Sequence, residues 1–382
     1  MAGSSDHGPA ADAQSLLGQS GPGVGATDGV GMGGGRARQL LDGAAVVGAA
    51  IGASLLFALV GLPSPALFGG LLAGLVRALA VSARTAVPAR ATTTAQAVIG
   101  VAMGALIDLE TLRAVAANWL PVLLVTVGTL ALSLAAGQAL RLQPGISPVT
   151  GAFAMIAGGA SGIIVMAREL GADERMVAVL QYLRVLLIVV LMPVVATTLY
   201  GASPGSGPGA TDGGPGWPAG LLFTVGCGVV GLVLGRLVRL PVPALLGPLL
   251  LAAALDLSGL TEDLGVPALV QTAAFLVIGL QVGLSFTRAS LRTIGRALPL
   301  ALAVIVVLIG ASAGLGAVLS AVTGASALDG YLATTPGGLY AVLATATDSG
   351  ADATFVLAVQ VLRLFVMLLT APLVARALRR YG

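Results

Sequence analysis

The most chemically informative residues of this chain are two arginines, each of which lies within a long apolar segment. Gln181 precedes Arg184 by three positions, and Gln360 precedes Arg363 by three. Residues three apart share one face of a helix, so each pair presents an amide and a guanidinium together. A guanidinium keeps its positive charge and offers a fork of donors that matches a carboxylate. This arrangement favours the binding of an organic anion.

Both arginines lie far from the ends of their segments. Arg184 follows Asp173 by eleven residues, and Arg363 follows Asp352 by eleven. Eleven residues of helix span about 16 Å, which reaches the midplane of a bilayer. An arginine there costs at least about 2.5 to 3.5 kcal/mol, so two symmetric instances need compensation. Two interpretations stay open: each guanidinium holds a hairpin through carbonyls or a carboxylate, or one or both face a solute carboxylate.

The two pairs are copies of one unit, because the second half of the chain repeats the first at an offset of 179 residues. The identities fall on polar and glycine positions, which a lipid-facing helix would not select. A duplicated unit with glycine-interrupted apolar segments is typical of a secondary transporter and its central binding site. The matching positions include Gly100 and Gly279, Gly104 and Gly283, Arg113 and Arg292, Gly158 and Gly337, Gly159 and Gly338, Asp173 and Asp352, Gln181 and Gln360, Arg184 and Arg363, and Pro193 and Pro372.

The composition is that of a chain embedded in a lipid bilayer. Hydrophobic residues make up 57% and charged residues 9%, and the mean hydropathy is +1.01. An ordinary soluble domain has about 25% charged residues. The apolar stretches lack the alternation of a β-barrel and are long enough to cross about 30 Å as helices. They include residues 44–60, 119–139, 220–238 and 298–322.

The basic charge has a topological explanation. All 19 basic residues are arginine, and they lie singly at the ends of apolar segments rather than in a patch. This pattern favours membrane orientation over direct binding of nucleic acid. The lone Cys227 lies in an apolar segment, which excludes a disulfide within the chain, and the lone His7 lies near the N-terminus.

The chain divides into four parts. Residues 1–40 are rich in glycine, serine and alanine and predict a disordered cytosolic tail rather than a cleavable signal peptide. Residues 41–200 form the first membrane repeat, residues 201–217 an extracytoplasmic linker, and residues 218–382 the second membrane repeat.

The orientation of the repeats follows from the fifth apolar segment of each, near residues 147–167 and 328–347, which carries a Gly-Gly pair in its middle. If this segment is a re-entrant hairpin, each repeat crosses five times and the second copy is inverted. With a cytoplasmic N-terminus, Arg113 is then the only loop arginine outside. The sequence therefore predicts an all-α polytopic membrane protein with two inverted repeats of five transmembrane helices plus one re-entrant hairpin each.

The two hairpin tips are the expected binding site. Non-helical backbone at membrane depth is tolerated only where protein or a water-filled cavity satisfies it. Two tips that meet near the midplane offer N–H groups to an anion and carbonyls to a cation. The candidate solute-binding residues are Gly158, Gly159, Ser161, Gln181, Arg184, Thr334, Thr335, Gly337, Gly338, Gln360 and Arg363.

Other polar and glycine positions have structural explanations as well. The pairs Gly100 with Gly104 and Gly279 with Gly283 are typical of a close helix-packing face. Coupling to Na⁺ at hairpin carbonyls, or to H⁺ at carboxylates, is open. The coupling candidates are Asp173, Asp348 and Asp352, of which the first and third are also suited to cap the helices that follow.

With these residues in view, the chain resembles the AbrB membrane-protein family, whose members contain two copies of one domain. The resemblance covers about residue 41 to the end. Its motifs are Leu-Pro-Ser-Pro-Ala-Leu-Phe-Gly-Gly at 62–70, Leu-Pro-Val-Pro-Ala-Leu-Leu-Gly-Pro at 240–248, the Ile-Gly-x-x-x-Gly segments, and the Gly-Gly hairpins followed by Gly-Ala-Asp and Gln-x-Leu-Arg.

Members of that family are described as regulators of gene expression or, under an old label, as ammonia monooxygenases. Copper chemistry needs histidine-rich ligation, and His7 is the lone histidine. We therefore expect no enzymatic activity, no catalytic residue, no cofactor and no bound metal. At fold level the hairpin unit is similar to the glutamate and citrate symporters, a likeness of architecture and Gly-Gly tips that does not carry the substrate over.

We expect a multi-pass protein of the bacterial inner membrane, with its N-terminus in the cytoplasm, that moves a small anionic organic solute by alternating access. The alternative is a membrane-embedded regulator of gene expression that acts through a partner, because the sequence offers no DNA-binding helix. The expected partners are the lipid bilayer and a small solute, with no direct nucleic acid. A homo-oligomer is compatible with the sequence.

Overall fold

Every regular element among the described residues is a helix. The computed structural model describes residues 32–81, 85–156, 171–202, 217–261, 264–286 and 295–379, together with residues 167, 288 and 292. Contacts group residues 45–382 into one unit and residues 1–44 into another, of which the first turns of the first helix are described. That helix begins at Met32, inside the segment 1–40 predicted to be a disordered tail.

The helices of the first half are α1 (Met32–Leu59), α2 (Pro65–Ala80), α3 (Ala89–Gly104), α4 (Leu109–Ala117), α5 (Trp119–Ala139), α6 (Pro148–Met155) and α8 (Glu174–Tyr200), with a short 3₁₀ turn at Leu140–Leu142. Those of the second half are α9 (Trp217–Leu237), α10 (Pro243–Leu257), α11 (Ala268–Leu284), α13 (Leu298–Thr323), α14 (Ala327–Thr334), α15 (Leu339–Asp348) and α16 (Ala353–Arg379), with a 3₁₀ turn at Gly295–Ala297.

The predicted duplication recurs in the helix boundaries. The starts of α5 and α13, of α6 and α14, and of α8 and α16 differ by 298 minus 119, 327 minus 148 and 353 minus 174, which is 179 in each case. Equal spacing of the elements means that both halves build the same series of helices. The amphipathic helix α4 is one that the sequence analysis does not predict.

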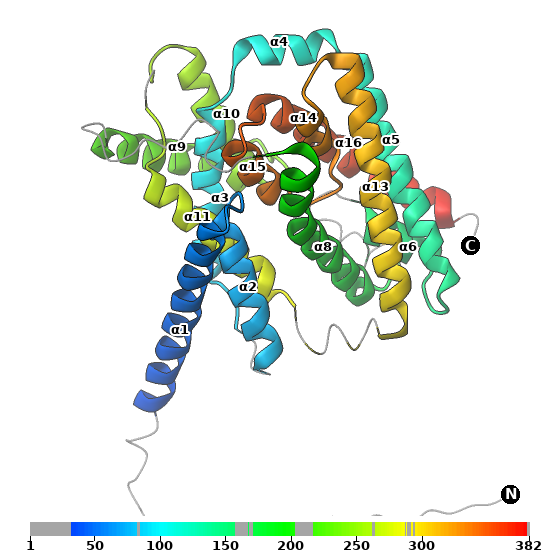
Figure 1. Cartoon of the computed structure of the whole chain (residues 1–382), viewed down its shortest axis with the longest axis horizontal. Helices are drawn as coiled ribbons and strands as arrows, with labels where there is room; N and C mark the ends of the chain where they lie inside the picture. The colour runs from blue at the N-terminus through cyan, green and yellow to red at the C-terminus, as the bar shows by residue number, and fades with distance from the viewer. Residues whose placement is uncertain are drawn as a thin grey trace, which may run out of the picture. The chain divides into compact units, whose positions relative to one another are not determined.

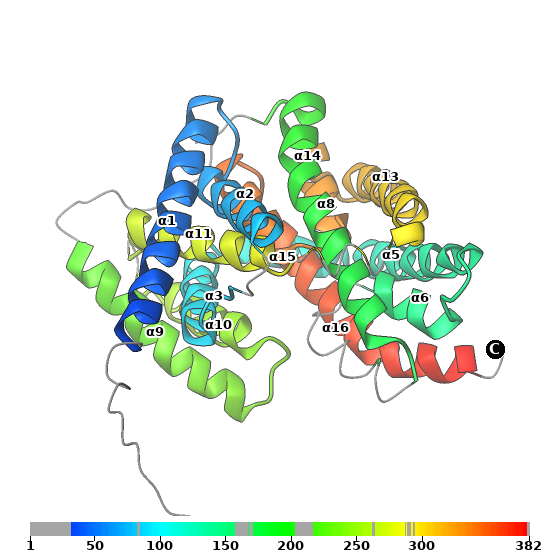
Figure 2. The same cartoon turned by 90° about the horizontal axis from the view of Figure 1, so that it is seen from below.

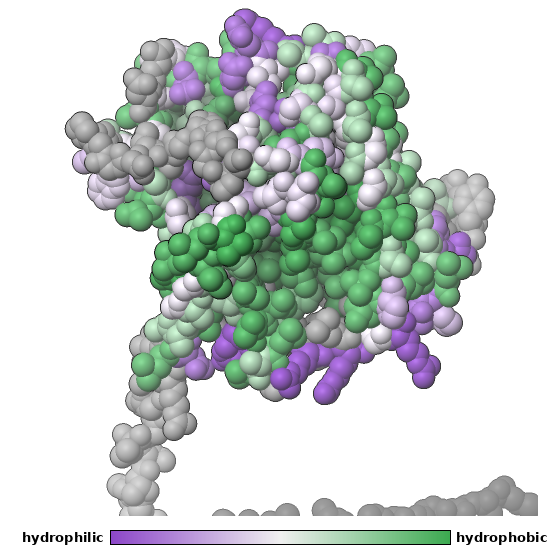
Figure 3. All heavy atoms as spheres, viewed as in Figure 1, coloured by the Kyte–Doolittle hydropathy of each residue, from purple (hydrophilic) through white to green (hydrophobic). Residues whose placement is uncertain are grey.

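Among the described residues, six helices are long and apolar enough to cross a membrane, judged by length and composition. Hydrophobic residues cover a broad area of the face shown in Figure 3, with hydrophilic residues at its upper and lower margins. The six spans are Leu41–Leu59, Trp119–Leu142, Glu174–Tyr200, Trp217–Leu237, Gly295–Thr323 and Ala353–Ala371.

The prediction of ten crossing helices is therefore met by length in six cases. The other four, α2, α3, α10 and α11, have 16, 16, 15 and 17 residues. About 20 residues are needed to cross the hydrocarbon. Proline, which is favoured at the first helical position, sets the late starts of α2 and α10 at Pro65 and Pro243.

The helices gather into two groups, which lie to the left and right in Figures 1 and 2. We call α2, α3, α9, α10 and α11 the glycine-packed group. We call α5, α6, α8, α13, α14, α15 and α16 the hairpin group. Helix α15 contacts both groups, with α11 on one side and α8 and α16 on the other.

The glycine-packed group consists of helices from the two halves in backbone contact. A Cβ atom placed on Gly279 would lie 2.0 Å from the carbonyl oxygen of Leu67, and one on Gly100 would lie 2.4 Å from that of Leu245. Residues 62–70 match residues 240–248 in sequence, so these are one contact made twice. The Gly-x-x-x-Gly pairs are thus confirmed as a packing face, since only glycine permits this approach.

The direction of these helices follows from the same contacts. On α2 and α11, Gly70 lies against Leu276, and Gly74 lies against Leu280. Residue numbers rise together, so α2 and α11 run parallel. On α3 and α10, Gly100 and Gly104 meet Leu245 and Leu249 in the same rising order, so α3 and α10 also run parallel.

The two ends of the fifth segment meet in each half. The backbone N–H of Asp352 donates to Oδ1 of Asp329 at 2.8 Å, which joins the end of the α14–α15 segment to its beginning. The N–H of Asp173 donates to Oγ1 of Thr150 at 3.1 Å, and both residues are the repeat mates of the first pair. Each segment thus returns to the level at which it started.

Candidate functional site

Long helices carry both Gln-x-x-Arg pairs into the interior. Arg184 is ten residues from the first residue of α8, and Arg363 is ten residues from the first residue of α16. Ten residues of helix span about 15 Å, so both arginines lie near the middle of their helices. Only 3% of Arg184 and 4% of Arg363 is exposed. An arginine that faces solvent would have excluded a central site, but neither arginine faces solvent.

The two glutamines bind equivalent carbonyls of the hairpins. Nε2 of Gln181 donates to the carbonyl oxygen of Phe153 at 2.8 Å, and Nε2 of Gln360 donates to that of Leu332 at 2.8 Å. Phe153 and Leu332 are repeat mates in the last turns of α6 and α14. Carbonyls in a last turn lack partners within the helix, so the amides satisfy groups that would otherwise be unpaired.

The two guanidiniums bind the hairpins next to these amides. Nη1 of Arg184 donates to the carbonyl oxygen of Met155, and Nη1 of Arg363 donates to that of Thr335. Nη2 of Arg363 also donates to Oε1 of Gln360. The interpretation that the arginines hold the hairpins through their carbonyls is therefore confirmed. Because a guanidinium has five N–H donors, these bonds leave others for a second role.

Arg184, which belongs to the first half, lies against the tip of the second hairpin. A Cβ atom on Gly337 would lie 3.4 Å from Nε of Arg184, although Arg184 itself binds the first hairpin. Gly337 has φ 141° and Gly338 has φ 67°, conformations that favour glycine. Arg184 and Arg363 are close enough for their charges to interact. The two repeats thus bring two like charges together.

The charge at this centre is not neutralised by its described partners. The atoms that accept from Arg184 and Arg363 are carbonyl and amide oxygens, all of them neutral. The Nε atoms of both arginines are buried without a hydrogen-bond partner among the described residues. A buried polar group without a partner is rare and costly. The arrangement is chemically suited to an anion.

The three coupling candidates have structural roles that the structure makes visible. Oδ1 of Asp173 accepts the N–H groups of Arg175 at 3.0 Å and Met176 at 3.1 Å, and Oδ1 of Asp352 accepts that of Phe355 at 2.9 Å. Both are N-caps, as the alternative interpretation predicts.

The third candidate, Asp348, ends α15 and joins it to the glycine-packed group. Its Oδ2 accepts the backbone N–H of Ser64, the residue before α2. Ser64 has φ 56°, a left-handed conformation that is uncommon outside glycine. Asp348 therefore links the second hairpin to the turn that begins α2.

The remaining predicted residues fall in different places. Oγ1 of Thr334 donates to the carbonyl oxygen of Ser312 at 2.8 Å, and Oγ1 of Thr335 donates to that of Tyr331 at 2.8 Å. The single hydrogen of each hydroxyl is therefore used within the protein. Predicted site residues Gly158, Gly159 and Ser161 lie outside the described residues.

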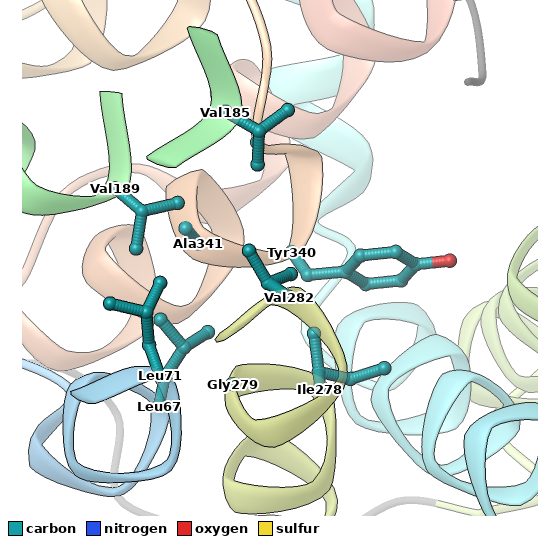
Figure 4. Close-up of a pocket in the computed structure, with 10 residues that line it drawn as sticks. Leu67, Leu71, Val185, Val189, Ile278, Gly279, Val282, Tyr340 and Ala341 are labelled. Atoms are coloured by element: carbon teal, nitrogen blue, oxygen red, sulfur yellow. The ribbon is translucent and has the colours of Figure 1, made fainter. Parts of the chain in front are cut away.

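An apolar cavity that the sequence did not predict lies beside the tip of the second hairpin. Its volume is about 40 Å³, and α2, α8, α11 and the beginning of α15 line it. Figure 4 shows its side chains, with the hydroxyl of Tyr340 pointing away from the others. Leu67, Val189 and Ile278 line it, and such residues are indistinguishable in sequence from an ordinary core.

The site lies wholly within a stretch that matches a known family. Residues 66–379 match the family model described as "Transition state regulatory protein AbrB". The chain belongs to the AbrB family. The AbrB match covers both Gln-x-x-Arg pairs and both hairpins, so the resemblance expected from the sequence is confirmed.

Two relatives share most of their length with this AbrB-family chain. "Putative regulator AbrB" of Escherichia coli (strain K12) is 33% identical over 329 residues, which cover 86% of this chain and 94% of that protein. "Uncharacterized protein YhjN" of Bacillus subtilis (strain 168) is 24% identical over 290 residues, covering 72% and 76% of the two chains.

Proposed function

We propose that this AbrB-family protein is a secondary transporter of the bacterial inner membrane, which moves a small anionic organic solute by alternating access. The observation that carries the proposal is the burial of two guanidiniums whose described partners are all neutral. Two unneutralised charges are expensive inside a membrane. An anionic solute that binds at a guanidinium offsets this positive charge, and its departure leaves the site ready for the next solute.

The inverted arrangement of the repeats is part of the proposal and has support in the helix directions. In Figure 1, α2 runs downward and α3 runs upward into α4, so these neighbours are antiparallel. Since α2 runs parallel to α11, α3 and its repeat mate α11 are antiparallel as well. Antiparallel mates are what two inverted copies, each with five crossings and a hairpin, require.

The proposed membrane sides agree with two contacts between the halves. Oγ1 of Thr111 donates to Oδ2 of Asp352 at 3.2 Å, and this topology puts both residues outside. Nε of Arg288 donates to the carbonyl oxygen of Leu79, and the topology puts both on the cytoplasmic side. We therefore keep the cytoplasmic N-terminus, the repeats 41–200 and 218–382, and the extracytoplasmic linker between them.

The two groups suggest how access alternates. Backbone contacts make the glycine-packed group a frame with little freedom to rearrange. In the hairpin group, each hairpin is held at its base and at its carbonyls by side chains that can exchange partners. A sodium ion would use carbonyl oxygens at the broken helix, whereas a proton would use Asp348. Coupling to a sodium gradient and coupling to a proton gradient are both compatible with this arrangement.

The names of the relatives favour a second candidate function. The Escherichia coli relative is named a regulator, and the family model carries a regulatory description. A membrane-embedded regulator that acts through a partner would use the same anion site to sense rather than to transport. The two functions differ in one measurable respect: a sensor binds its solute without carrying it across a membrane.

Reconstitution of the purified protein in liposomes tests the proposal. Uptake of radiolabelled carboxylates and amino acids is measured for the unchanged protein, for Arg184→Gln and for Arg363→Gln. We expect each variant to lose about 100-fold, since truncating a partner of a buried charge pair costs about 2 to 5 kcal/mol. The matched control is Arg236→Gln, which removes an exposed arginine at the end of α9 and should leave uptake unchanged.

Two results would contradict transport. Full uptake by both arginine variants would reduce the guanidiniums to supports for the hairpins. Stabilisation of the protein by a carboxylate without any uptake would favour the sensor. A solute at 100 times its Kd should stabilise the protein by about 2.7 kcal/mol, which a thermal-unfolding measurement detects.

A further inference from the structure

We infer that the solute is a short-chain aliphatic monocarboxylate, whose carboxylate binds Arg184 and whose alkyl group occupies the apolar cavity. This inference rests on the proposed function, and it names the substrate class of the same site. It follows from the position, the lining and the size of the cavity.

Two residues that line the cavity are chain neighbours of residues at the guanidinium. On α8, Val185 follows Arg184 directly and lines the cavity. On the hairpin, Gly337 lies beside Nε of Arg184, and the next residue, Gly338, lines the cavity. Neighbouring Cα atoms are about 3.8 Å apart, so Gly337, which lies against Nε of Arg184, is one residue away from the cavity wall at Gly338, a step that one small molecule would span.

The lining selects against a second polar group on the solute. The cavity is surrounded by aliphatic side chains of α2, α8 and α11, including Leu71, Val189 and Val282. The polar atom of Tyr340 points away from them in Figure 4. A second carboxylate or a hydroxyl would lose its water there without gaining a partner. A dicarboxylate is therefore a poor fit, although its charge would suit two arginines.

The size limits the length of the alkyl group. The cavity of about 40 Å³ compares with about 10 to 15 Å³ for one water molecule in the same measure. Three or four carbon atoms beyond the carboxylate therefore fill it. Each buried methylene group that fits should raise affinity about fourfold.

Binding measurements on the purified protein in detergent test this inference because they compare affinities directly, whereas uptake of short-chain acids into liposomes includes a passive leak of the neutral form that protein-free liposomes must subtract. Acetate, propionate, butyrate, isovalerate, octanoate and succinate are compared by calorimetric titration. We expect affinity to rise about fourfold per carbon from acetate to butyrate, to stop rising before octanoate, and to be weaker for succinate than for butyrate.

A variant that fills the cavity should remove this preference. Val189 is 2% exposed and lines the cavity, whereas its neighbour Val190 is 46% exposed. Val189→Leu should lower the affinity for isovalerate about tenfold and change the affinity for acetate by less than about twofold. Val190→Leu should change neither affinity. Ala341→Val narrows the cavity from the hairpin side. This variant replaces Val189→Leu in the test if Val189→Leu does not fold.

The outcomes separate this inference from the proposed function. Equal affinity for acetate and butyrate, or equal weakening of both by Val189→Leu, would overturn the monocarboxylate while binding that depends on Arg184 still stands. Rising affinity through octanoate would mean that the cavity admits a lipid acyl chain instead. If no acid binds, or if Arg184→Gln binds all of them normally, both the inference and the anion site fail.

Discussion

The glycine-packed group and the hairpin group bury different kinds of side chain. Among the described residues, all buried polar side chains belong to the hairpin group or its hairpin ends, except Ser64 and Thr224. The glycine-packed helices meet through backbone, which leaves little space between them for polar side chains. The hairpin group contains interrupted helices, whose free carbonyls require donors. In the group of uninterrupted helices, close packing determines which residue types are buried. In the group with interrupted helices, the need to satisfy free carbonyls determines them.

The two buried arginines of the hairpin group also differ in how they are held. Arg363 donates to a hairpin carbonyl and to Oε1 of Gln360, so its guanidinium is held on two sides. Arg184 donates to the carbonyl oxygen of Met155 and lies against Gly337 of the opposite hairpin. Repeated sequence therefore gives one firmly held arginine and one that faces the other half, which is why we assign the carboxylate to Arg184.

The largest effect is expected in the glycine-packed group. Gly279→Ala would place a Cβ atom 2.0 Å from the carbonyl oxygen of Leu67, and neither backbone can move away without separating α2 from α11. We expect a loss of about 3 kcal/mol in the free energy of unfolding, measured by SDS titration in mixed micelles. Gly310→Ala in α13 has nothing within 4 Å and should be neutral or stabilising by about 0.5 to 1 kcal/mol.

If Gly279→Ala unfolds at the same SDS concentration as the unchanged protein, the backbone contact between the halves is not what holds that group together. The contrast with the hairpin group would then disappear.

A smaller effect is expected at the base of the hairpins. Asp329→Ala removes the acceptor of the N–H groups of Ser326 and Asp352, and should cost about 1 to 3 kcal/mol of stability. Thr150→Val removes the hydroxyl that accepts the N–H of Asp173 and is hydrogen-bonded to the hydroxyl of Ser147, and should cost about 1 kcal/mol. Unfolding by SDS titration measures both, and Thr150→Ser, which keeps the hydroxyl, is the control. A larger loss for Thr150→Val than for Asp329→Ala would reverse the expected order.

The smallest effect is expected at α4, outside both groups. The backbone N–H of Thr111 donates to Oδ2 of Asp108 at 2.7 Å, and this bond lowers the pKa of Asp108 from its usual value. A lowered carboxyl pKa stabilises the cap above its unfolded value of about 3.9, and the stabilisation is lost as pH falls through the lowered pKa. Hydrogen-exchange protection of the Thr111 amide should therefore be constant from pH 7 to about 4 and fall below that. Asp108→Asn should abolish the pH dependence; protection that begins to fall near pH 6 would point to another group.

Much of the hairpin group could be predicted from its sequence because its signals are local or repeated. The broken helix at Pro336 and Gly337, the N-caps at Asp173 and Asp352, and the shared face of Gln181 and Arg184 all follow from residues within a few turns of each other. Helix length was less predictable. Segments such as α3 and α11 read as ordinary crossings, yet they begin late, after Pro88 and Pro267.

The sequence by itself determined the membrane setting, the duplication and the burial of two guanidiniums, because each depends on composition or on spacing along one chain. The tertiary structure alone decided which oxygens receive those guanidiniums, that α2 pairs with α11 rather than with its own neighbour, and that a cavity opens beside Gly338. The pairing of α2 with α11 and the lining of the cavity join residues from opposite halves, and each guanidinium bond joins residues 28 or 29 positions apart, so only the packing of complete helices brings these positions together.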